Sequence, residues 1–391
     1  MDANAMNTDL SDPMIRPFRL LVPQGSIDDL HARLERIRWA DEAPDAAWAY
    51  GSSLAFMREM AREWRTRFDW RQTEAQLNAW PQYSTRIDGV DVHFLHVPGK
   101  GPHPRPLLLS HGWPGSVLEF MKLIPLLTDP AAHGGDPADA FTVVVPSLPG
   151  YTLSFREGQP RKSITEIGAM FHTLMHERLG YPRYGAQGGD WGSFVTAWLG
   201  AYRAQHLTGI HLNLMPIKRD PAIFTNPTEC ERRYLAELQA WLKEETGYQA
   251  IQGTRPQTLA FALSDSPIGL AAWITEKFRA WTDCAGDPRN ALTMDEMLGN
   301  ISLYWFTNCI GASFWPYYAR MHGKWPIDGR IEVPTGYCEF PREILRPPRE
   351  AAERQFNIRR WSVMAKGGHF AALEQPAALA GEIRELFRDL A

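Results

Sequence analysis

The stretch that decides the fold is YGAQGGDWGSF, residues 184–194. Residues 184–187 predict a short strand, the glycines after them predict a tight turn, and a helix is expected from Trp191. Asp190 stands at this junction, between small residues that a sharp turn requires. Such a turn holds Asp190 in a strained, exposed position. The positive end of the next helix favours its ionised carboxylate.

The same strand–loop–helix rhythm surrounds this stretch. Repeated short apolar strands separated by helices predict a mostly parallel sheet covered on both faces. A turn of the form small-x-acid-x-small in such a sheet is the nucleophile elbow of the α/β-hydrolase fold, with Asp in place of Ser. The strands are expected at 106–110, 141–145, 184–187, 207–214, 330–336 and 361–365.

The chain divides into four predicted parts. An N-terminal segment, 15–90, begins with a strand expected at Phe18–Val22 and ends in a hairpin that turns at Asp88-Gly89. The α/β core is expected in two pieces, 91–215 and 326–391. Residues 216–325 interrupt it with helical, aromatic, Pro-punctuated sequence, which is typical of a cap over an active site.

Two further stretches supply partners for Asp190. Lys366-Gly367-Gly368-His369-Phe370 follows the last predicted strand, and nucleophile, acid, histidine is the chain order of this fold. His369 is therefore the expected base. The acid should follow the strand at 330–336, where Glu339 and Glu343 both fit by spacing. That acid would hold the imidazole tautomer and stabilise its protonated form.

The stretch HGWPGS, residues 111–116, directly follows the strand at 106–110. In this fold an oxyanion hole takes one backbone N–H from such a loop and one from the residue after the nucleophile. Trp113 and Trp191 occupy those places. We expect His111 to orient the loop by hydrogen bonding rather than to act as the base.

An Asp nucleophile restricts the chemistry. Serine attack on saturated carbon would leave an ether, whereas a carboxylate leaves an alkyl ester that water can cleave. Asp190 therefore implies displacement at saturated carbon, followed by a water step assisted by His369. The leaving group distinguishes the alternatives: a halide needs a cradle of weak donors, and an epoxide oxygen needs a proton donor.

Composition excludes several classes. The 391 residues carry 41 Lys and Arg against 45 Asp and Glu, a net charge of −4, so no basic field is offered to nucleic acid. No apolar run is long enough to span a bilayer, and residues 1–12 lack the features of a secretory signal.

The four cysteines form no CxxC pair, which favours a reduced, cytoplasmic setting. His172 and His176 lack a third metal ligand, so we expect them to be surface residues and expect no metal site.

The chain resembles the microsomal-type epoxide hydrolases, a family that includes juvenile hormone epoxide hydrolases and soluble fungal and bacterial members. The similarity runs from about residue 15 to 390. The strings that carry it are HGWPGS, GGDWGS, GYQAIQGTRPQT, DSPIGLAAWITEKF, VPTGY followed by FPRE, and KGGHFAALE. The resemblance implies opening of a small apolar epoxide to a vicinal diol with no cofactor.

It also implies residue roles. Asp190 would be the nucleophile and His369 the base. The family's acid lies in a Phe-Pro-x-Glu string, matched by residues 340–343, which favours Glu343 over Glu339. Two cap tyrosines would donate to the epoxide oxygen.

Tyr248 matches the first of these tyrosines and Tyr317 the second, with Tyr318 as a neighbouring alternative. A phenol titrates near pH 10 and is a neutral donor at pH 7, which suits this task. The family's loop also suggests a cis bond between Trp113 and Pro114.

The main alternative is a haloalkane or haloacid dehalogenase, which would use the same Asp190 with a halide cradle of Trp or Asn donors. A non-catalytic binder and a serine esterase are less favoured, because the set of reactive residues is intact and no Ser occupies the elbow. Aromatic residues of the predicted cap are candidates for lining the pocket: Phe224, Trp305, Phe314 and Trp315.

Vertebrate relatives begin with a membrane anchor that this sequence does not show, so the resemblance implies a soluble enzyme. The oligomeric state is open, with a homodimer among the options. The natural epoxide is open as well.

Overall fold

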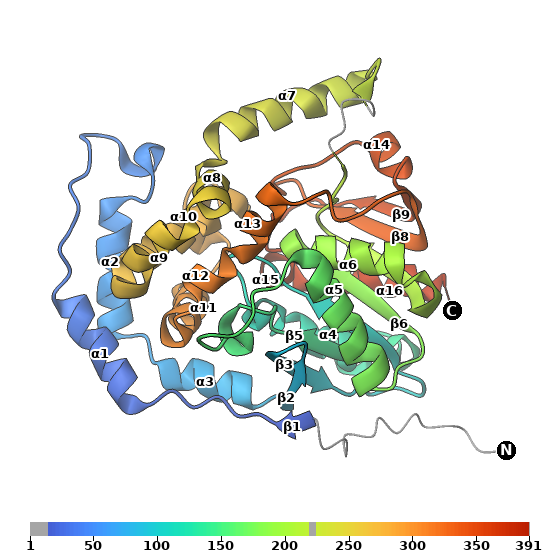
Figure 1. Ribbon diagram of the computed structural model, residues 1–391, viewed down its shortest axis with the longest axis horizontal. Helices are drawn as coiled ribbons and strands as arrows, with labels where there is room; N and C mark the ends of the chain where they lie inside the picture. Colours follow the sequence, from blue (N-terminus) through green and yellow to red (C-terminus); the bar gives the residue numbers. More distant parts are fainter. Residues whose placement is uncertain (1–14, 219–223, 391) are drawn as a thin grey trace.

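The elbow stretch lies near the middle of a large twisted sheet (Figure 1). The computed structural model describes residues 15–218 and 224–390, so the signal-sequence prediction for residues 1–12 lies outside the described residues. Within that part of the chain nine strands form one sheet in the order β1-β2-β3-β5-β4-β6-β7-β8-β9. The strands are β1 (Ile15–Pro17), β2 (Gln82–Ile87), β3 (Val90–Val97), β4 (Arg105–Ser110), β5 (Phe141–Pro146), β6 (Tyr184–Gly188), β7 (Leu207–Leu212), β8 (Ile331–Glu339) and β9 (Phe356–Val363).

The sheet is mostly parallel, as predicted. Neighbouring strands are parallel from β5 through β4, β6, β7 and β8 to β9. The strands β1, β2 and β3 extend the sheet beyond β5, and each of them pairs antiparallel with its neighbours. The β2–β3 hairpin turns at Asp88-Gly89, whose positive φ angles of 47° and 82° fit the tight turn that this pair predicts. Central strands carry almost continuous apolar runs because helices cover both faces.

Helices cover the two faces of the sheet. On one face α5 (Ile164–His172) packs against α6 (Asp190–Tyr202), which contacts β6 and β7. On the other face α4 (Leu123–Thr128) packs against α16 (Pro376–Arg388). A π-helical segment, Thr173–Arg178, extends α5, and the short helices α14 (Arg349–Glu353) and α15 (Ala371–Glu374) lie in the C-terminal part.

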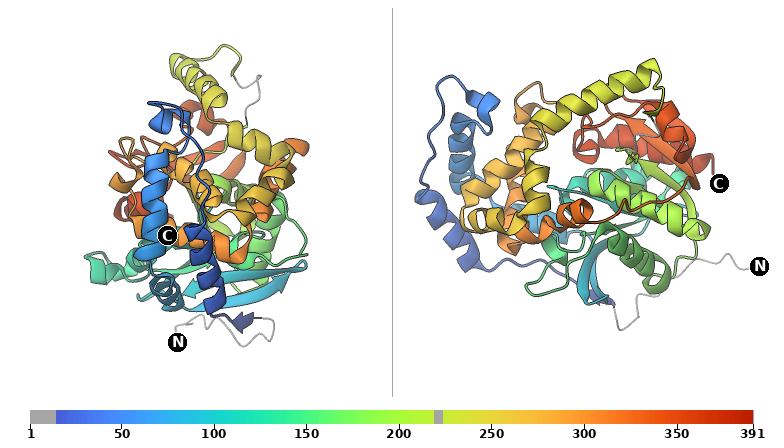
Figure 2. Two further views of the ribbon diagram at one scale, coloured as in Figure 1. Left: turned by 90° about the vertical axis from the view of Figure 1, so that its left-hand side faces the viewer. Right: turned by 45° about the horizontal axis from the view of Figure 1, so that its top comes forward.

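A second layer of helices lies over one end of the sheet (Figures 1 and 2). Here α13 contacts α8, α12 contacts α9, and α10 contacts both α9 and α11. The longest of these helices, α7, lies along the outer edge in Figure 1. The helices are α7 (Glu229–Glu244), α8 (Gly247–Thr254), α9 (Pro256–Asp265), α10 (Pro267–Trp281), α11 (Met294–Thr307), α12 (Ile310–Ser313) and α13 (Trp315–His322).

The N-terminal helices lie on the outer side of this layer (Figure 2). They are α1 (Gln24–Glu35), α2 (Leu54–Thr66) and α3 (Trp70–Asn78), and they contact α10 and α11. The prediction of a strand at Phe18–Val22 is wrong, because the first strand spans Ile15–Pro17. The backbone of Leu20 and Val22 instead donates to the side chains of Asn78 and Glu74 on α3. The last strand also begins earlier than expected, at Phe356 rather than Trp361.

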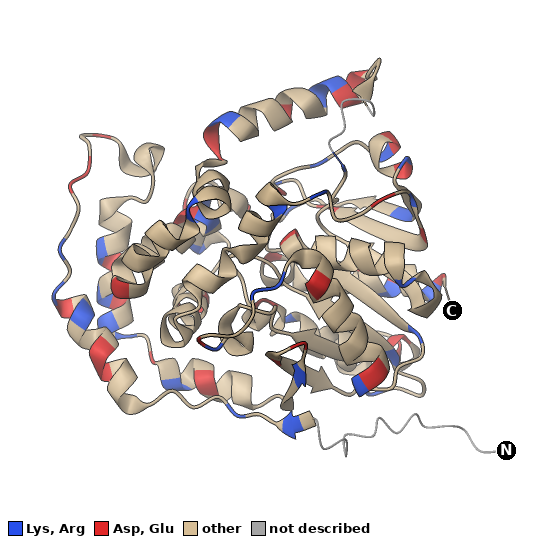
Figure 3. Ribbon diagram, in the orientation of Figure 1, with Lys and Arg blue, Asp and Glu red and all other residues tan. Residues whose placement is uncertain are grey.

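Figure 3 shows Lys and Arg residues interspersed with Asp and Glu residues along the outer elements, whereas the central strands carry few charged residues. Among the described residues, no helix is long and apolar enough to cross a membrane.

Candidate active site

Asp190 lies where β6 ends and α6 begins. It has a φ of +43°, a left-handed conformation that is uncommon for a residue with a side chain. A Cβ on Gly188 would come within 2.2 Å of the Gly192 carbonyl oxygen, and one on Gly192 within 1.9 Å of the Ser110 carbonyl oxygen. The elbow therefore needs its glycines, and the strained backbone projects the carboxylate beyond the sheet.

The parallel register brings the second stretch to Asp190. Ser110 at the end of β4 pairs with Gly188 at the end of β6, so the loops that follow them are neighbours. The Trp113 N–H donates to Asp190 Oδ1 at 2.7 Å. The Trp113–Pro114 bond is cis, as the family resemblance suggests.

His111 holds this loop rather than facing Asp190 as a base. Its Nε2 accepts from the Leu148 N–H at 3.0 Å, and its Nδ1 lies 3.0 Å from the Gly112 carbonyl oxygen. Burial lowers the pKa of His111 to about 4, so the ring is neutral and Nδ1–H donates to Gly112. This arrangement agrees with the orienting role expected from the sequence.

The loop that follows β9 brings His369 to Asp190. An isolated bridge pairs Arg342 with Gly368, so the loops after β8 and β9 run side by side. His369 Nε2 lies 3.4 Å from Asp190 Oδ2, and Nδ1 lies 2.6 Å from Glu343 Oε1. Of the two carboxylates that spacing left open, the structure brings Glu343 to the imidazole.

The charge balance of this trio favours a protonated imidazole in the resting protein. Burial by itself lowers the pKa of His369, but the carboxylates of Glu343 and Asp190 outweigh it and hold that pKa well above its usual value. Glu339, at the end of β8, is half-buried, and burial raises the pKa of its carboxyl group.

Two phenols lie across from the carboxylate. Tyr248 on α8 and Tyr317 on α13 are buried, with ring centroids 5.7 Å apart. Burial raises the pKa of both phenols, so each is a neutral donor at ordinary pH. Gln249 Nε2 donates to Tyr248 Oη at 2.9 Å, which leaves the phenol proton for another acceptor. Tyr318, the neighbouring alternative, instead stacks on His322 at 4.1 Å.

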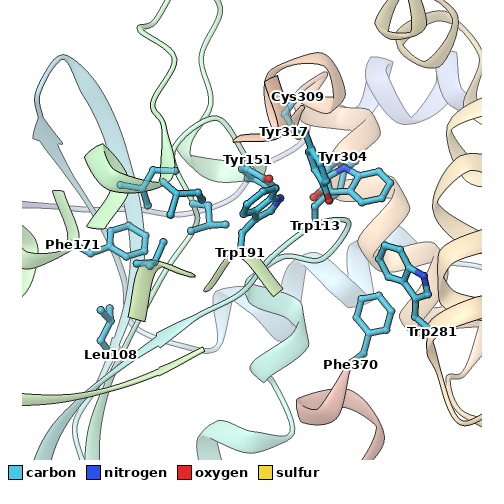
Figure 4. Packing of buried hydrophobic residues seen from close by; sticks show 14 of the residues in the cluster. Leu108, Trp113, Tyr151, Phe171, Trp191, Trp281, Tyr304, Cys309, Tyr317 and Phe370 are labelled. Atoms are coloured by element: carbon cyan, nitrogen blue, oxygen red, sulfur yellow. The ribbon is translucent and has the colours of Figure 1, made fainter. Parts of the chain in front are cut away.

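Indole rings surround these phenols. Figure 4 shows Trp113, Trp191 and Tyr317 grouped together, with Trp281 beside them. Tyr317 meets Trp191 edge-on at 4.8 Å, and Tyr248 stacks on Trp113 at 5.4 Å with 8° between the ring planes. The rings fix the phenols at the same end of the sheet as Asp190.

A cavity of about 420 Å³ opens between Asp190 and the two phenols. None of the four aromatic residues suggested from the sequence lines it. Phe314 packs on Trp113, Trp315 on Tyr318, Phe224 on Tyr234, and Trp305 lies beside Arg33. The lining is mostly apolar, and besides Asp190 and the phenols it includes Trp191, Phe194, Leu214, Met215, Ile217, Tyr234, Trp241, Met321, Trp325, Ile344 and Leu345.

Comparisons with known proteins identify the family of this chain. The family model for the epoxide hydrolase N terminus matches residues 15–120, and that for the alpha/beta hydrolase fold matches residues 105–253. A Stigmatella aurantiaca protein named as a candidate epoxide hydrolase is 46% identical over 96% of this chain and 85% of its own length. Epoxide hydrolase 1 of Sus scrofa is 37% identical over 96% of this chain and 88% of its own length.

The chain belongs to the epoxide hydrolase family. The solved structure of Aspergillus niger epoxide hydrolase covers 96% of both chains with a TM-score of 0.84 and 30% identity. That of juvenile hormone epoxide hydrolase from Bombyx mori covers 96% of this chain and 94% of its own, with a TM-score of 0.87 and 28% identity. The α/β-hydrolase fold predicted from the elbow is therefore confirmed.

This epoxide hydrolase chain has one site feature that was not anticipated from its sequence. A second cavity of about 20 Å³, room for a single water, lies between Asp190, His369 and Glu119. Burial raises the pKa of Glu119 to about 8; the charge of His369 opposes this rise and that of Asp190 adds to it. Glu119 comes three residues after the HGWPGS stretch, and no spacing rule marks it.

The expectation that His172 is a surface residue is wrong. Its side chain is buried, and its Nδ1 lies 3.1 Å from the Tyr184 hydroxyl. The ring stacks on His176 at 5.2 Å and lies 4.8 Å from His206. Even so, across residues 15–218 and 224–390 no group of three His, Cys, Asp or Glu side chains is arranged to hold a metal ion.

Proposed function

We propose that this member of the family hydrolyses an epoxide bearing an apolar group to a vicinal diol, through an ester on Asp190. One observation carries the proposal: a carboxylate paired with His369 faces two buried phenols across an apolar cavity of about 420 Å³. The phenols suit a leaving oxygen that needs a proton, and the apolar lining suits an uncharged substituent.

In the first step Asp190 attacks one oxirane carbon. A bond forms between the carboxylate oxygen and that carbon, and the carbon–oxygen bond of the ring breaks toward the ring oxygen. Tyr248 and Tyr317 donate to that oxygen, and one of them transfers its proton as the ring opens. Because Gln249 already donates to Tyr248 Oη, the proton of that phenol is free to point into the cavity.

In the second step water cleaves the ester. Alkylation removes the negative charge of Asp190, which is one of the two charges that raise the pKa of His369. The pKa of His369 therefore falls once the ester has formed, so its proton passes to the phenolate that ring opening leaves, and the neutral imidazole can then act as a base. The neutral imidazole takes a proton from the attacking water, and Glu343, whose Oε1 lies 2.6 Å from Nδ1, stabilises the imidazolium that results.

The small cavity beside Glu119 suits this water, since it adjoins both Asp190 and His369. Attack on the ester carbonyl places negative charge on the carboxyl oxygen that accepts from the Trp113 N–H at 2.7 Å. The backbone N–H of Trp191, at the first turn of α6, is the second proposed oxyanion donor. As this intermediate collapses, the bond between the carboxyl carbon and the substrate oxygen breaks and that oxygen takes the second proton of the water. The diol is released and the Asp190 carboxylate is restored.

The same proposal includes the domain roles. We propose that residues 216–325 form the cap, that residues 15–90 pack on the core and cap, and that residues 91–215 and 326–391 make up the α/β core. The cap supplies both phenols and the core supplies the nucleophile, base and acid. A substrate must therefore enter between them.

A diol assay paired with a halide assay tests this function. The purified protein is given an aryl epoxide and, separately, a chloroalkane of similar size, with Asp190→Asn as the control. We expect diol formation that is lost in Asp190→Asn, and no chloride release. Chloride release without diol formation would favour the dehalogenase alternative.

A further inference from the structure

Lys277 is a buried lysine in the layer of helices above the site. It lies on α10 with 6% of its surface exposed. Its ammonium is 2.6 Å from Glu276 Oε2 and 3.7 Å from Glu245 Oε2. Burying an ammonium group is costly unless it is paired. Its neighbour Glu276 could pair with it equally well in solvent, so the ion pair does not explain why the cation is buried here.

The ammonium lies against the proposed donor. Lys277 Nζ is 4.7 Å from the centroid of the Tyr248 ring and 5.4 Å from that of Trp281. Both rings pack against other residues of the site. Tyr248 stacks on Trp113, whose N–H holds Asp190, and Trp281 meets His369 edge-on at 5.1 Å. The cation is therefore fixed by two aromatic rings of the site.

A cation at this place acts on the proton that Tyr248 gives up. Burial and the charge of Asp190 both raise the pKa of Tyr248, which makes the phenol a reluctant acid. As the epoxide oxygen takes the proton, negative charge develops on the phenol oxygen and its ring. A positive charge at the ring attracts the electron-rich π system before the transfer and the phenolate after it.

We propose that Lys277 is a positioning residue for ring opening, whose ammonium holds the Tyr248 ring and stabilises the charge that develops on the phenol oxygen. This inference rests on the proposed role of Tyr248 as a proton donor. The step balances: the breaking carbon–oxygen bond gives its electron pair to the ring oxygen, which takes the Tyr248 proton. The phenolate recovers its proton from the His369 imidazolium, which is restored by the proton that it takes from water in ester hydrolysis.

Two substitutions on α10 separate this role from a structural one. Lys277→Met and Glu276→Gln both break the 2.6 Å ion pair, but only the first removes the cation from the Tyr248 ring. In a single-turnover assay of ester formation, we expect Lys277→Met to be slower by about 10- to 100-fold. Glu276→Gln should match or exceed the wild-type rate, and Lys277→Arg should recover part of the loss. Equal losses in Lys277→Met and Glu276→Gln would overturn the proposal.

A double variant supplies the second readout. If Lys277 acts through Tyr248, then Lys277→Met should have no further effect on ester formation in a Tyr248→Phe background. Independent, multiplicative losses would overturn the proposal. Should Lys277→Met fail to fold, Glu276→Gln still tests it, because a slower rate there contradicts it. Absence of any ester in the wild type would overturn the proposed function instead, so the two failures are distinguishable.

Discussion

Gly112→Ala tests whether the position of the Asp190 carboxylate controls ester formation. A Cβ on Gly112 would lie 2.1 Å from Asp190 Oδ1 and 2.3 Å from Asp190 Cβ. Ordinary contact begins at 3.4 Å, so the two carbons must separate by about 1.1 Å. A misplacement of about 1 Å costs on the order of 100-fold in rate when reacting atoms must be aligned. We therefore expect single-turnover ester formation to fall by about 100-fold.

Gly247→Ala is the matched control. Gly247 precedes the proposed donor Tyr248, yet a Cβ there meets nothing within 4 Å, so the same substitution should leave ester formation unchanged. Ester formation is measured by rapid quenching and intact mass, and thermal unfolding shows that both variants are folded. A Gly112→Ala protein that forms ester within a few-fold of the wild-type rate would refute the reasoning.

Three further predictions concern the donors, the acid and a buried histidine. Tyr248→Phe and Tyr317→Phe should each slow ester formation by about 10- to 100-fold and leave ester hydrolysis unchanged, which rapid quenching resolves; normal ester formation in both would remove the donor assignment. Glu343→Gln should slow ester hydrolysis by about 100-fold, so that the ester accumulates, and an absence of accumulation would contradict its role as the acid. Burial lowers the pKa of His211 to about 4, so as the pH falls below about 6.5 the unfolded chain binds a proton that the folded chain does not. The contribution of His211 to the free energy of unfolding should drop by about 1.6 kcal/mol between pH 6.5 and 5, and His211→Leu should remove that drop in urea titrations; parallel pH dependences in the two proteins would contradict this.

The parts of the site predictable from sequence are those set by local geometry. The elbow at Asp190 needs small residues one and two positions away, and those residues are visible in the string. Its place between β6 and α6 follows from the same stretch. The loop at residues 111–116 and the loop that carries His369 each follow a strand of the sheet, as the sequence predicts.

Tertiary contacts decided the features that the sequence left open or misassigned. Spacing could not separate Glu343 from Glu339, because the choice depends on the bridge between Arg342 and Gly368. The stretch Phe18–Val22 has a strand-like pattern, yet its backbone bonds to side chains of α3 more than fifty residues away.

The pocket lining and Glu119 were missed for a related reason. Which aromatic residues face the cavity depends on how the helices α7 to α13 cross one another, and composition carries no information on that. Glu119 comes to His369 only because the loop after β4 and the loop after β9 meet at the same end of the sheet. His172 is buried because Tyr184 and His206 cover it, and both lie outside its own helix.

The ester on Asp190 is the central claim, and a single turnover in water labelled with heavy oxygen tests it most directly. The enzyme is held in excess over an aryl epoxide, and both the diol and the peptide that contains Asp190 are analysed by mass spectrometry. If water cleaves the ester at its carbonyl carbon, the diol of the first turnover is unlabelled and the Asp190 peptide gains one heavy oxygen. Heavy oxygen in the diol with an unlabelled Asp190 peptide would mean that water attacks the epoxide directly, which would contradict the account.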